Sequence, residues 1–83
     1  MKWTVVWANQ ALAQLTSLWL DAPDRTEITK ASSQIDVLLC NRPLEVGEER
    51  TPPERVLFIK PLALLYDVVE EDCLVTVYAV WRW

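Results

Sequence analysis

The spacing of apolar residues changes twice along this chain, and this change limits the folds that the chain can adopt. Residues 2–7 alternate, with Trp3, Val5 and Trp7 on one face, which is typical of a strand. Apolar positions then recur at helical spacing over residues 9–41. After a polar stretch, strand-like segments return. The pattern predicts an α+β fold whose elements follow the order β-α-α-β-β-β.

Two helices are predicted, and the first covers residues 9–21. We expect Asn9 to be its N-cap, because Asn side chains accept hydrogen bonds from the unpaired amides of a first turn. The helix should end near Asp21, since Pro23 disfavours helical geometry at the residue before it. Its apolar stripe consists of Leu12, Leu15 and Trp19, with Ala11 and Leu18 beside them.

The second helix is predicted over residues 25–41. Asp24 lies three residues before Glu27, which is a variant of the capping box that begins many helices. Pro43 follows the last apolar positions and ends the helix. Because only a short turn separates the two helices, we expect them to form an antiparallel hairpin.

The remaining residues predict a loop and three strands. Residues 44–54 are polar and read as the loop, and strands are predicted over residues 55–60, 62–70 and 73–82. The connections between these strands are too short for crossovers, so the strands should form an antiparallel meander. We therefore expect a two-helix hairpin packed on one face of a small antiparallel sheet, in a single domain over residues 1–83.

The composition excludes several kinds of chemistry. The only glycine, Gly47, excludes the Gly-rich phosphate loops of nucleotide-binding proteins. The absence of His excludes His-dependent nucleophiles and His-ligated metals. A net charge of −4 disfavours general nucleic-acid binding, because neutralising phosphates supplies most of that affinity. We expect no cofactor and no metal site.

Other features predict a cytoplasmic protein without a membrane segment. The two cysteines, Cys40 and Cys73, are fewer than a small secreted domain usually carries, so we expect both to be reduced and buried, with one structural disulfide between them as the alternative. Asn9 and Gln10 interrupt the apolar residues near the amino terminus, unlike a signal peptide. No apolar run approaches the roughly 20 residues that span a bilayer.

Short sequence pieces, taken in order, resemble a known family along nearly the whole chain. Each piece is weak alone, but their order and spacing are more specific. They are Trp7-Ala8, Ala11-Leu12, Asp24-Arg25, Ile35-Asp36, Leu38-Leu39, Pro43, Val46-Gly47-Glu48, Arg50, Arg55-Val56-Leu57-Phe58, Tyr66-Asp67-Val68, and Leu74-Val75 through Arg82. In this arrangement the chain is similar to the RelE/ParE superfamily of bacterial type II toxins.

The resemblance implies a partner and two alternative activities. Such toxins are usually encoded beside an antitoxin whose extended or helical segment wraps them. One branch of the family cleaves messenger RNA on the ribosome, with basic residues and often a Tyr on the open sheet face. The other branch poisons DNA gyrase.

The chain departs from the nuclease branch at the positions that matter most. Where that branch has basic residues on the second and third strands, this sequence has Val56, Phe58 and Ala63, and the carboxyl-terminal position falls on Trp83. Alkyl and aromatic groups cannot stabilise the charge that develops on a phosphorane. If the protein is nevertheless an enzyme, its candidate catalytic residues are Arg50, Arg55, Lys60 and Arg82, although solvated surface charge is the simpler explanation of these four.

The alternation of the strands predicts an apolar surface on the sheet. We expect an inward set of Leu57, Ile59, Leu64, Tyr66, Val68, Tyr78 and Val80, which makes Tyr66 a core residue. The outward set is Val56, Phe58, Lys60, Ala63, Leu65, Asp67, Val77, Trp81 and Trp83. Soluble monomers rarely leave so large an apolar patch uncovered. The predicted partner-binding residues are therefore Val56, Phe58, Leu65, Trp81 and Trp83.

Three functional hypotheses follow. The first is a ParE-like toxin that binds a protein target such as gyrase, is neutralised by a cognate antitoxin, and forms a homo-oligomer when free. The second is a RelE-like, ribosome-dependent messenger RNA endoribonuclease with a non-standard residue set. The third is a degenerate, non-toxic member that binds only an antitoxin.

Overall fold

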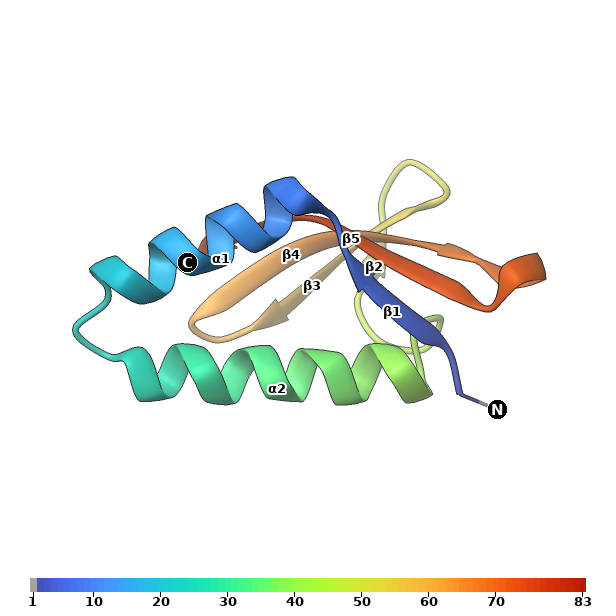
Figure 1. Cartoon of the computed structure of the whole chain (residues 1–83). Helices are drawn as coiled ribbons and strands as arrows, with labels where there is room; N and C mark the ends of the chain where they lie inside the picture. The colour runs from blue at the N-terminus through green and yellow to red at the C-terminus, as the bar shows by residue number, and fades with distance from the viewer. Residues whose placement is uncertain (1) are drawn as a thin grey trace.

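A computed structural model describes residues 2–83, which form two helices and a five-stranded sheet (Figure 1). The predicted order of the main elements is confirmed. A two-residue strand, β2, is additional and lies in the predicted loop. The elements are β1 (Thr4–Trp7), α1 (Asn9–Asp21), α2 (Arg25–Asn41), β2 (Glu48–Glu49), β3 (Glu54–Ile59), β4 (Leu62–Val69), the 3-10 turn η1 (Glu70–Asp72) and β5 (Leu74–Arg82).

The sheet is mixed, with the strand order β1-β5-β4-β3-β2. The predicted meander is confirmed, because β3, β4 and β5 pair antiparallel. The expectation of an antiparallel sheet fails at β1, which pairs parallel to β5. The helical hairpin separates β1 from the other strands in sequence, so turn lengths do not restrict the direction in which β1 joins the sheet.

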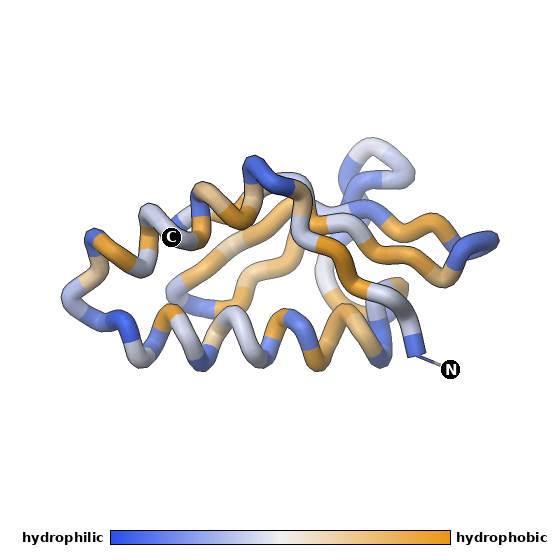
Figure 2. The backbone as a smooth tube through the Cα atoms, viewed as in Figure 1, coloured by the Kyte–Doolittle hydropathy of each residue, from blue (hydrophilic) through white to orange (hydrophobic). Residues whose placement is uncertain are grey.

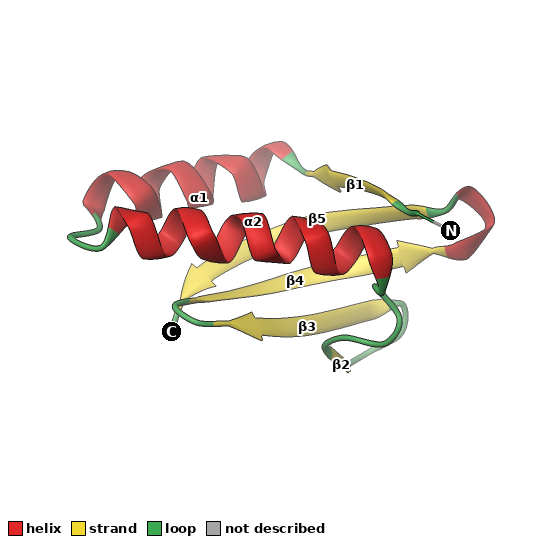
Figure 3. Cartoon of the chain, turned by 90° about the horizontal axis from the view of Figure 1, so that it is seen from below, coloured by secondary structure: helices red, strands yellow, loops and turns green. Residues whose placement is uncertain are grey.

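Both helices lie on one face of the sheet, as predicted (Figure 3). Their buried positions, which include Ile28, Ile35 and Leu39 of α2, pack against Leu64 and Tyr66 of β4. Strands β4 and β5 are largely apolar along their length, whereas the helices alternate between apolar and polar residues (Figure 2). The core therefore lies between the hairpin and the inner face of the sheet.

A β-bulge in β5 changes the predicted alternation of that strand. Leu65 pairs with Ala79 and Tyr66 pairs with Val77, which leaves Tyr78 as an extra residue. Val77, expected to face outward, is fully buried in the core, and Tyr78, expected inward, is 41% exposed. The bulge shifts the side-chain alternation by one residue, and this is why the two assignments were wrong.

The predicted caps at the helix starts also differ in detail. Asn9 is the first helical residue, and Ala8 occupies the N-cap position without a side-chain hydrogen bond. Asp24 is the N-cap of α2, as predicted, but its side chain makes no capping hydrogen bond. The Asp24 carboxylate instead accepts two hydrogen bonds from Arg82, which lies at the end of β5. Cys40 and Cys73 form no disulfide, but the expectation that both are buried was wrong, since both are half-buried.

Candidate protein-binding surface

The face of the sheet turned away from α1 and α2, here called the outer face, carries rows of apolar side chains. One row across β3, β4 and β5 consists of Val56, Leu65 and Ala79, and the next of Phe58, Ala63 and Trp81. Side chains in register on one face contact one another directly. Val56 and Ala63 are buried within these rows, at 7% and 0% exposure, yet neither belongs to the core cluster on the helix side.

Aromatic side chains gather at one end of the outer face and remain open to solvent, and we call Phe58, Trp81 and Trp83 the aromatic cluster. They are 41%, 39% and 55% exposed. Phe58 and Trp83 contact edge to face, with ring centroids 5.0 Å apart. Lys60 Nζ lies 5.9 Å from the Trp83 ring centroid, which is within the range of a cation–π contact. The five predicted partner-binding residues thus share one face, although Val56 is covered and Leu65 is half-buried.

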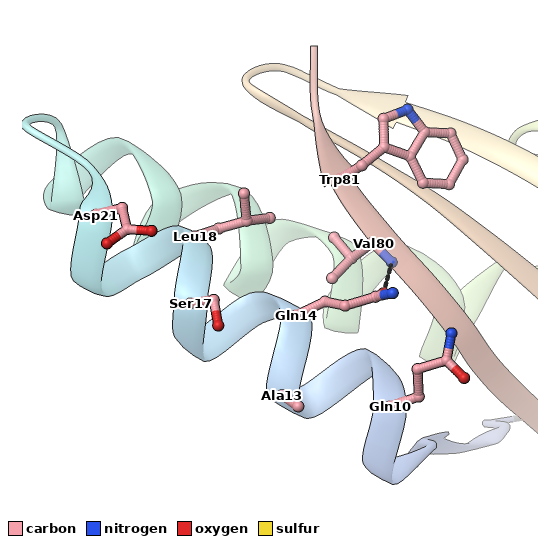
Figure 4. A pocket seen from close by; sticks show the side chains of 8 residues that line it. All are labelled: Gln10, Ala13, Gln14, Ser17, Leu18, Asp21, Val80 and Trp81. Atoms are coloured by element: carbon pink, nitrogen blue, oxygen red, sulfur yellow. Dashed lines mark hydrogen bonds between the residues drawn. The ribbon is translucent and has the colours of Figure 1, made fainter.

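Trp81 projects from the carboxyl-terminal half of β5, away from α1 (Figure 4). In this half the edge of β5 that faces α1 lacks a paired strand, because β1 pairs only with the residues from Leu74 to Val77. Gln14 of α1 covers part of this edge, since its Oε1 accepts a hydrogen bond of 2.9 Å from the backbone amide of Val80. A groove between α1 and this edge has Gln14, Leu18 and Trp81 among its lining residues.

The opposite end of the outer face is acidic, and we call Glu48, Glu54 and Asp67 the acidic corner. Glu54 pairs in register with Asp67, and Glu48 pairs with Val56. The Tyr78 hydroxyl donates a 2.9 Å hydrogen bond to Asp67 Oδ2, and this bond raises the pKa of Tyr78. Asp67 Oδ1 is buried and accepts no hydrogen bond from the described part of the chain.

Sequence reasoning missed this acidic corner. Asp67 was placed correctly on the outer face, but Tyr78 was assigned to the core because the bulge was not anticipated. Glu48 and Glu54 fell in the predicted loop, where no face could be assigned to them. Glu54 and Val56 are two residues apart and so lie on the same face of a strand. This spacing is the signal that would have started β3 at Glu54, one residue before the predicted start at residue 55.

Two of the four candidate catalytic cations are held in structural contacts. The Arg82 guanidinium donates to both carboxylate oxygens of Asp24, over 2.9 and 2.8 Å. This hydrogen-bonded pair lowers the pKa of Asp24 and raises that of Arg82. Bidentate pairing ties the end of β5 to the start of α2.

Arg55 is the second cation in a structural role, and it lies on the inner face of the sheet. Its side chain is 13% exposed and lies 3.8 Å from Glu49. Its Nη2 donates to the carbonyl oxygens of Val46 and Gly47, over 3.1 and 3.4 Å. Arg55 therefore fixes the loop between α2 and β2, where Gly47 adopts a φ of +71°.

Tyr66 is a core residue, as predicted, and it supports the same loop. Its side chain is fully buried, and burial raises the pKa of its hydroxyl. The hydroxyl oxygen lies 2.8 Å from the carbonyl oxygen of Pro43 and 2.9 Å from that of Val46. The hydroxyl has one proton, so it donates to one of these two carbonyl oxygens at a time. It therefore holds the backbone of the loop after α2 and does not face a substrate.

The four candidate cations do not form one site. Lys60 and Arg82 line a common groove with Trp83. Arg50 lies beyond the amino-terminal end of β3, and Arg55 is on the inner face.

Among residues 2–83, no group of three or more His, Cys, Asp or Glu side chains is placed to hold a metal ion. Neither α1 nor α2 is long and apolar enough to cross a membrane.

Comparisons with known proteins give matches at the level of structure. No protein-family model and no curated protein sequence matches the chain. A chain of the RelBE2 toxin–antitoxin complex from Mycobacterium tuberculosis matches with a TM-score of 0.81 and 21% identity, covering 100% of this chain and 93% of that one. A chain of the chromosomal ParDE system of P. aeruginosa matches at 0.72 and 17% identity, with 96% and 95% covered.

The isolated E. coli RelE toxin also matches, with a TM-score of 0.68 and 18% identity over 96% of this chain and 83% of that one. These likenesses define the class of fold: the chain has the fold of the RelE and ParE toxins. Both RelE and ParE systems occur among the matches, so the fold is common to the two branches.

Proposed function

We propose that this chain is the toxin of a bacterial type II toxin–antitoxin pair and that it is of the ParE-like kind, which acts by binding a protein. The RelE/ParE fold supports a toxin role, because the matched structures include complexes of toxin with antitoxin. On this proposal the protein acts in the bacterial cytoplasm, DNA gyrase is the candidate target, and a cognate antitoxin covers the outer face.

The observation that carries the proposal is the aromatic cluster on the outer face. Phe58, Trp81 and Trp83 are exposed there, where a nuclease needs cations to stabilise a phosphorane. Aromatic residues in such a patch are typical anchors of protein interfaces. Arg55 and Arg82, which could have supplied charge, are bound to backbone carbonyls and to Asp24.

One feature favours the RelE-like alternative. Lys60 and Arg82 line the same groove beside Trp83, so a cation that is not paired with Asp24, Lys60, and an aromatic ring face a nucleotide there. Asp24 and Glu27 line this groove as well, and their charge opposes phosphate binding. We therefore rank the endoribonuclease second.

The test combines growth and biochemistry. Expression of the protein should arrest bacterial growth, and co-expression of the product of the neighbouring gene should restore it. Purified protein should inhibit DNA supercoiling by gyrase and should leave messenger RNA on programmed ribosomes intact.

Other outcomes select the alternatives. Site-defined cleavage of messenger RNA establishes the nuclease, and Arg50, Arg55, Lys60 and Arg82 are then the residues to substitute. Antitoxin binding without growth arrest identifies a degenerate, non-toxic protein.

A further inference from the structure

We propose that the segment which occupies the outer face is basic as well as apolar, with its cation seated on the acidic corner and its apolar side chains on the aromatic cluster. The inference rests on the proposed function and adds to it the chemistry of the antitoxin segment.

The charges of the outer face are mostly separated along the strands, although Arg50, whose backbone amide donates to the Glu54 carbonyl oxygen, lies at the acidic end. Glu48, Glu54 and Asp67 lie at the end where β4 finishes, and the acidic turn η1 follows directly after β4. Lys60 lies at the opposite end, above the ring of Trp83. An approaching segment therefore meets negative charge at one end and an aromatic surface at the other.

Asp67 lies at the centre of the acidic corner, where it pairs in register with Glu54. Tyr78 satisfies its Oδ2, but its buried Oδ1 accepts no hydrogen bond within residues 2–83. Because Oδ1 has no exposed surface, a Lys or Arg of an incoming segment does not bond to it directly and instead supplies opposite charge to the carboxylate as a whole. Glu54, in register with Asp67, adds a second carboxylate to the same point.

The register gives the spacing that the segment needs. Asp67 and Ala63, at the centre of the Phe58 and Trp81 row, are four residues apart on β4, or roughly 13 Å at about 3.3 Å per residue. An extended segment spans this distance with about four residues, and a helix spans it with about nine. A basic residue and a large apolar residue at one of these separations define the expected motif.

Two other occupants fit the surface less well. A nucleic acid would place phosphates against the acidic corner, which is repulsive. A second copy of the chain, packed antiparallel, brings one Lys60 to each acidic corner and leaves most of the negative charge unmatched.

The experiment uses the full chain and two synthetic peptides that differ only in charge. Both contain the same Trp and Leu residues, and one carries two Arg residues where the other carries two Glu. Binding is followed by fluorescence anisotropy in low and high salt, at protein concentrations where sedimentation shows a monomer. The basic peptide should bind at least roughly tenfold more tightly than the acidic one, and high salt should reduce the difference.

Variants assign the effect to the proposed residues. Asp67→Asn combined with Glu54→Gln should remove most of the preference for the basic peptide, while Trp83→Ser should weaken both peptides. Glu45→Gln is the control, because it removes an exposed carboxylate that pairs with Arg42 at the end of α2, away from the aromatic cluster. Equal binding of the two peptides, or a preference that survives Asp67→Asn with Glu54→Gln, overturns the proposal. A failure here leaves the growth-arrest result standing, and an absence of growth arrest leaves the peptide result standing, so the two proposals fail separately.

Discussion

Asp24 pairs with Arg82, and the sequence around Asp24 does not predict this contact. The spacing of Asp24 and Glu27 predicted a capping box, and the position of the cap was right. The carboxylate is nevertheless used by Arg82, 58 residues away. A local motif cannot reveal a long-range partner that competes for the same side chain, so this contact was beyond the reach of sequence reasoning.

The pair predicts a pH dependence of stability. The pKa of Asp24 is lowered from 3.8 by Arg82, so its stabilising contribution is present above that unfolded value and is lost as the pH falls through the lowered folded value. Asp24→Asn should therefore flatten the decline of the free energy of unfolding on the acid side of about pH 4. Urea denaturation at several pH values measures this.

The control for that measurement is Asp21→Asn, which removes a nearby carboxylate at the end of α1 and leaves the Arg82 pair intact. An acid decline that stays as steep in Asp24→Asn as in the parent protein would contradict the assignment.

At the scale of elements, the helices and the meander could be predicted, because apolar periodicity and Pro positions determine them. The bulge at Tyr78 and the parallel pairing of β1 could not. Both depend on packing between distant segments, since an extra residue in β5 is tolerated only where neighbouring strands and helices accommodate it. The aromatic cluster was predicted from alternation alone, whereas the acidic corner required the observed register.

A prediction concerns the edge of β5 that has no neighbouring strand. Gln14 supplies the acceptor for the Val80 amide where no strand does. Gln14→Ala should speed hydrogen exchange of that amide by roughly fivefold, because one hydrogen bond contributes about 1 kcal/mol to local stability. Exchange followed by NMR measures the effect.

Gln10→Ala serves as the control, because Gln10 lines the same groove and makes no hydrogen bond to Val80. If Gln10→Ala and Gln14→Ala accelerate the Val80 amide equally, the Gln14 contact does not protect the edge.

At the scale of the whole molecule, apolar surface lies on the side of the sheet that the helices leave open. Burying one large aromatic side chain contributes about 1.5–3 kcal/mol, so the aromatic cluster favours association even after the entropy cost of binding. We expect the isolated protein to self-associate through the outer face. Trp81→Ser combined with Trp83→Ser should yield a monomer with unchanged helical content, as judged by sedimentation and far-ultraviolet circular dichroism.

Trp19 offers a matched control for this prediction. Its side chain, on α1 and therefore on the helix side of the sheet, is 39% exposed, as is that of Trp81. Trp19→Ser should leave the sedimentation coefficient of the parent protein unchanged. Loss of self-association in Trp19→Ser alone, or a parent protein that sediments as a monomer even at the highest concentrations tested, would contradict association through the outer face.

The parallel pairing of β1 with β5 also bears on how the protein is made. Among the described strands, β1 leaves the ribosome first, and its sheet neighbour β5 is synthesised last. Helices can form while the chain emerges, but the sheet cannot close until β5 is free. A nascent chain that stalls before β5 therefore leaves β1 unpaired and lacks Trp81 and Trp83. Such an unfinished product would be open to proteolysis before it could engage any partner.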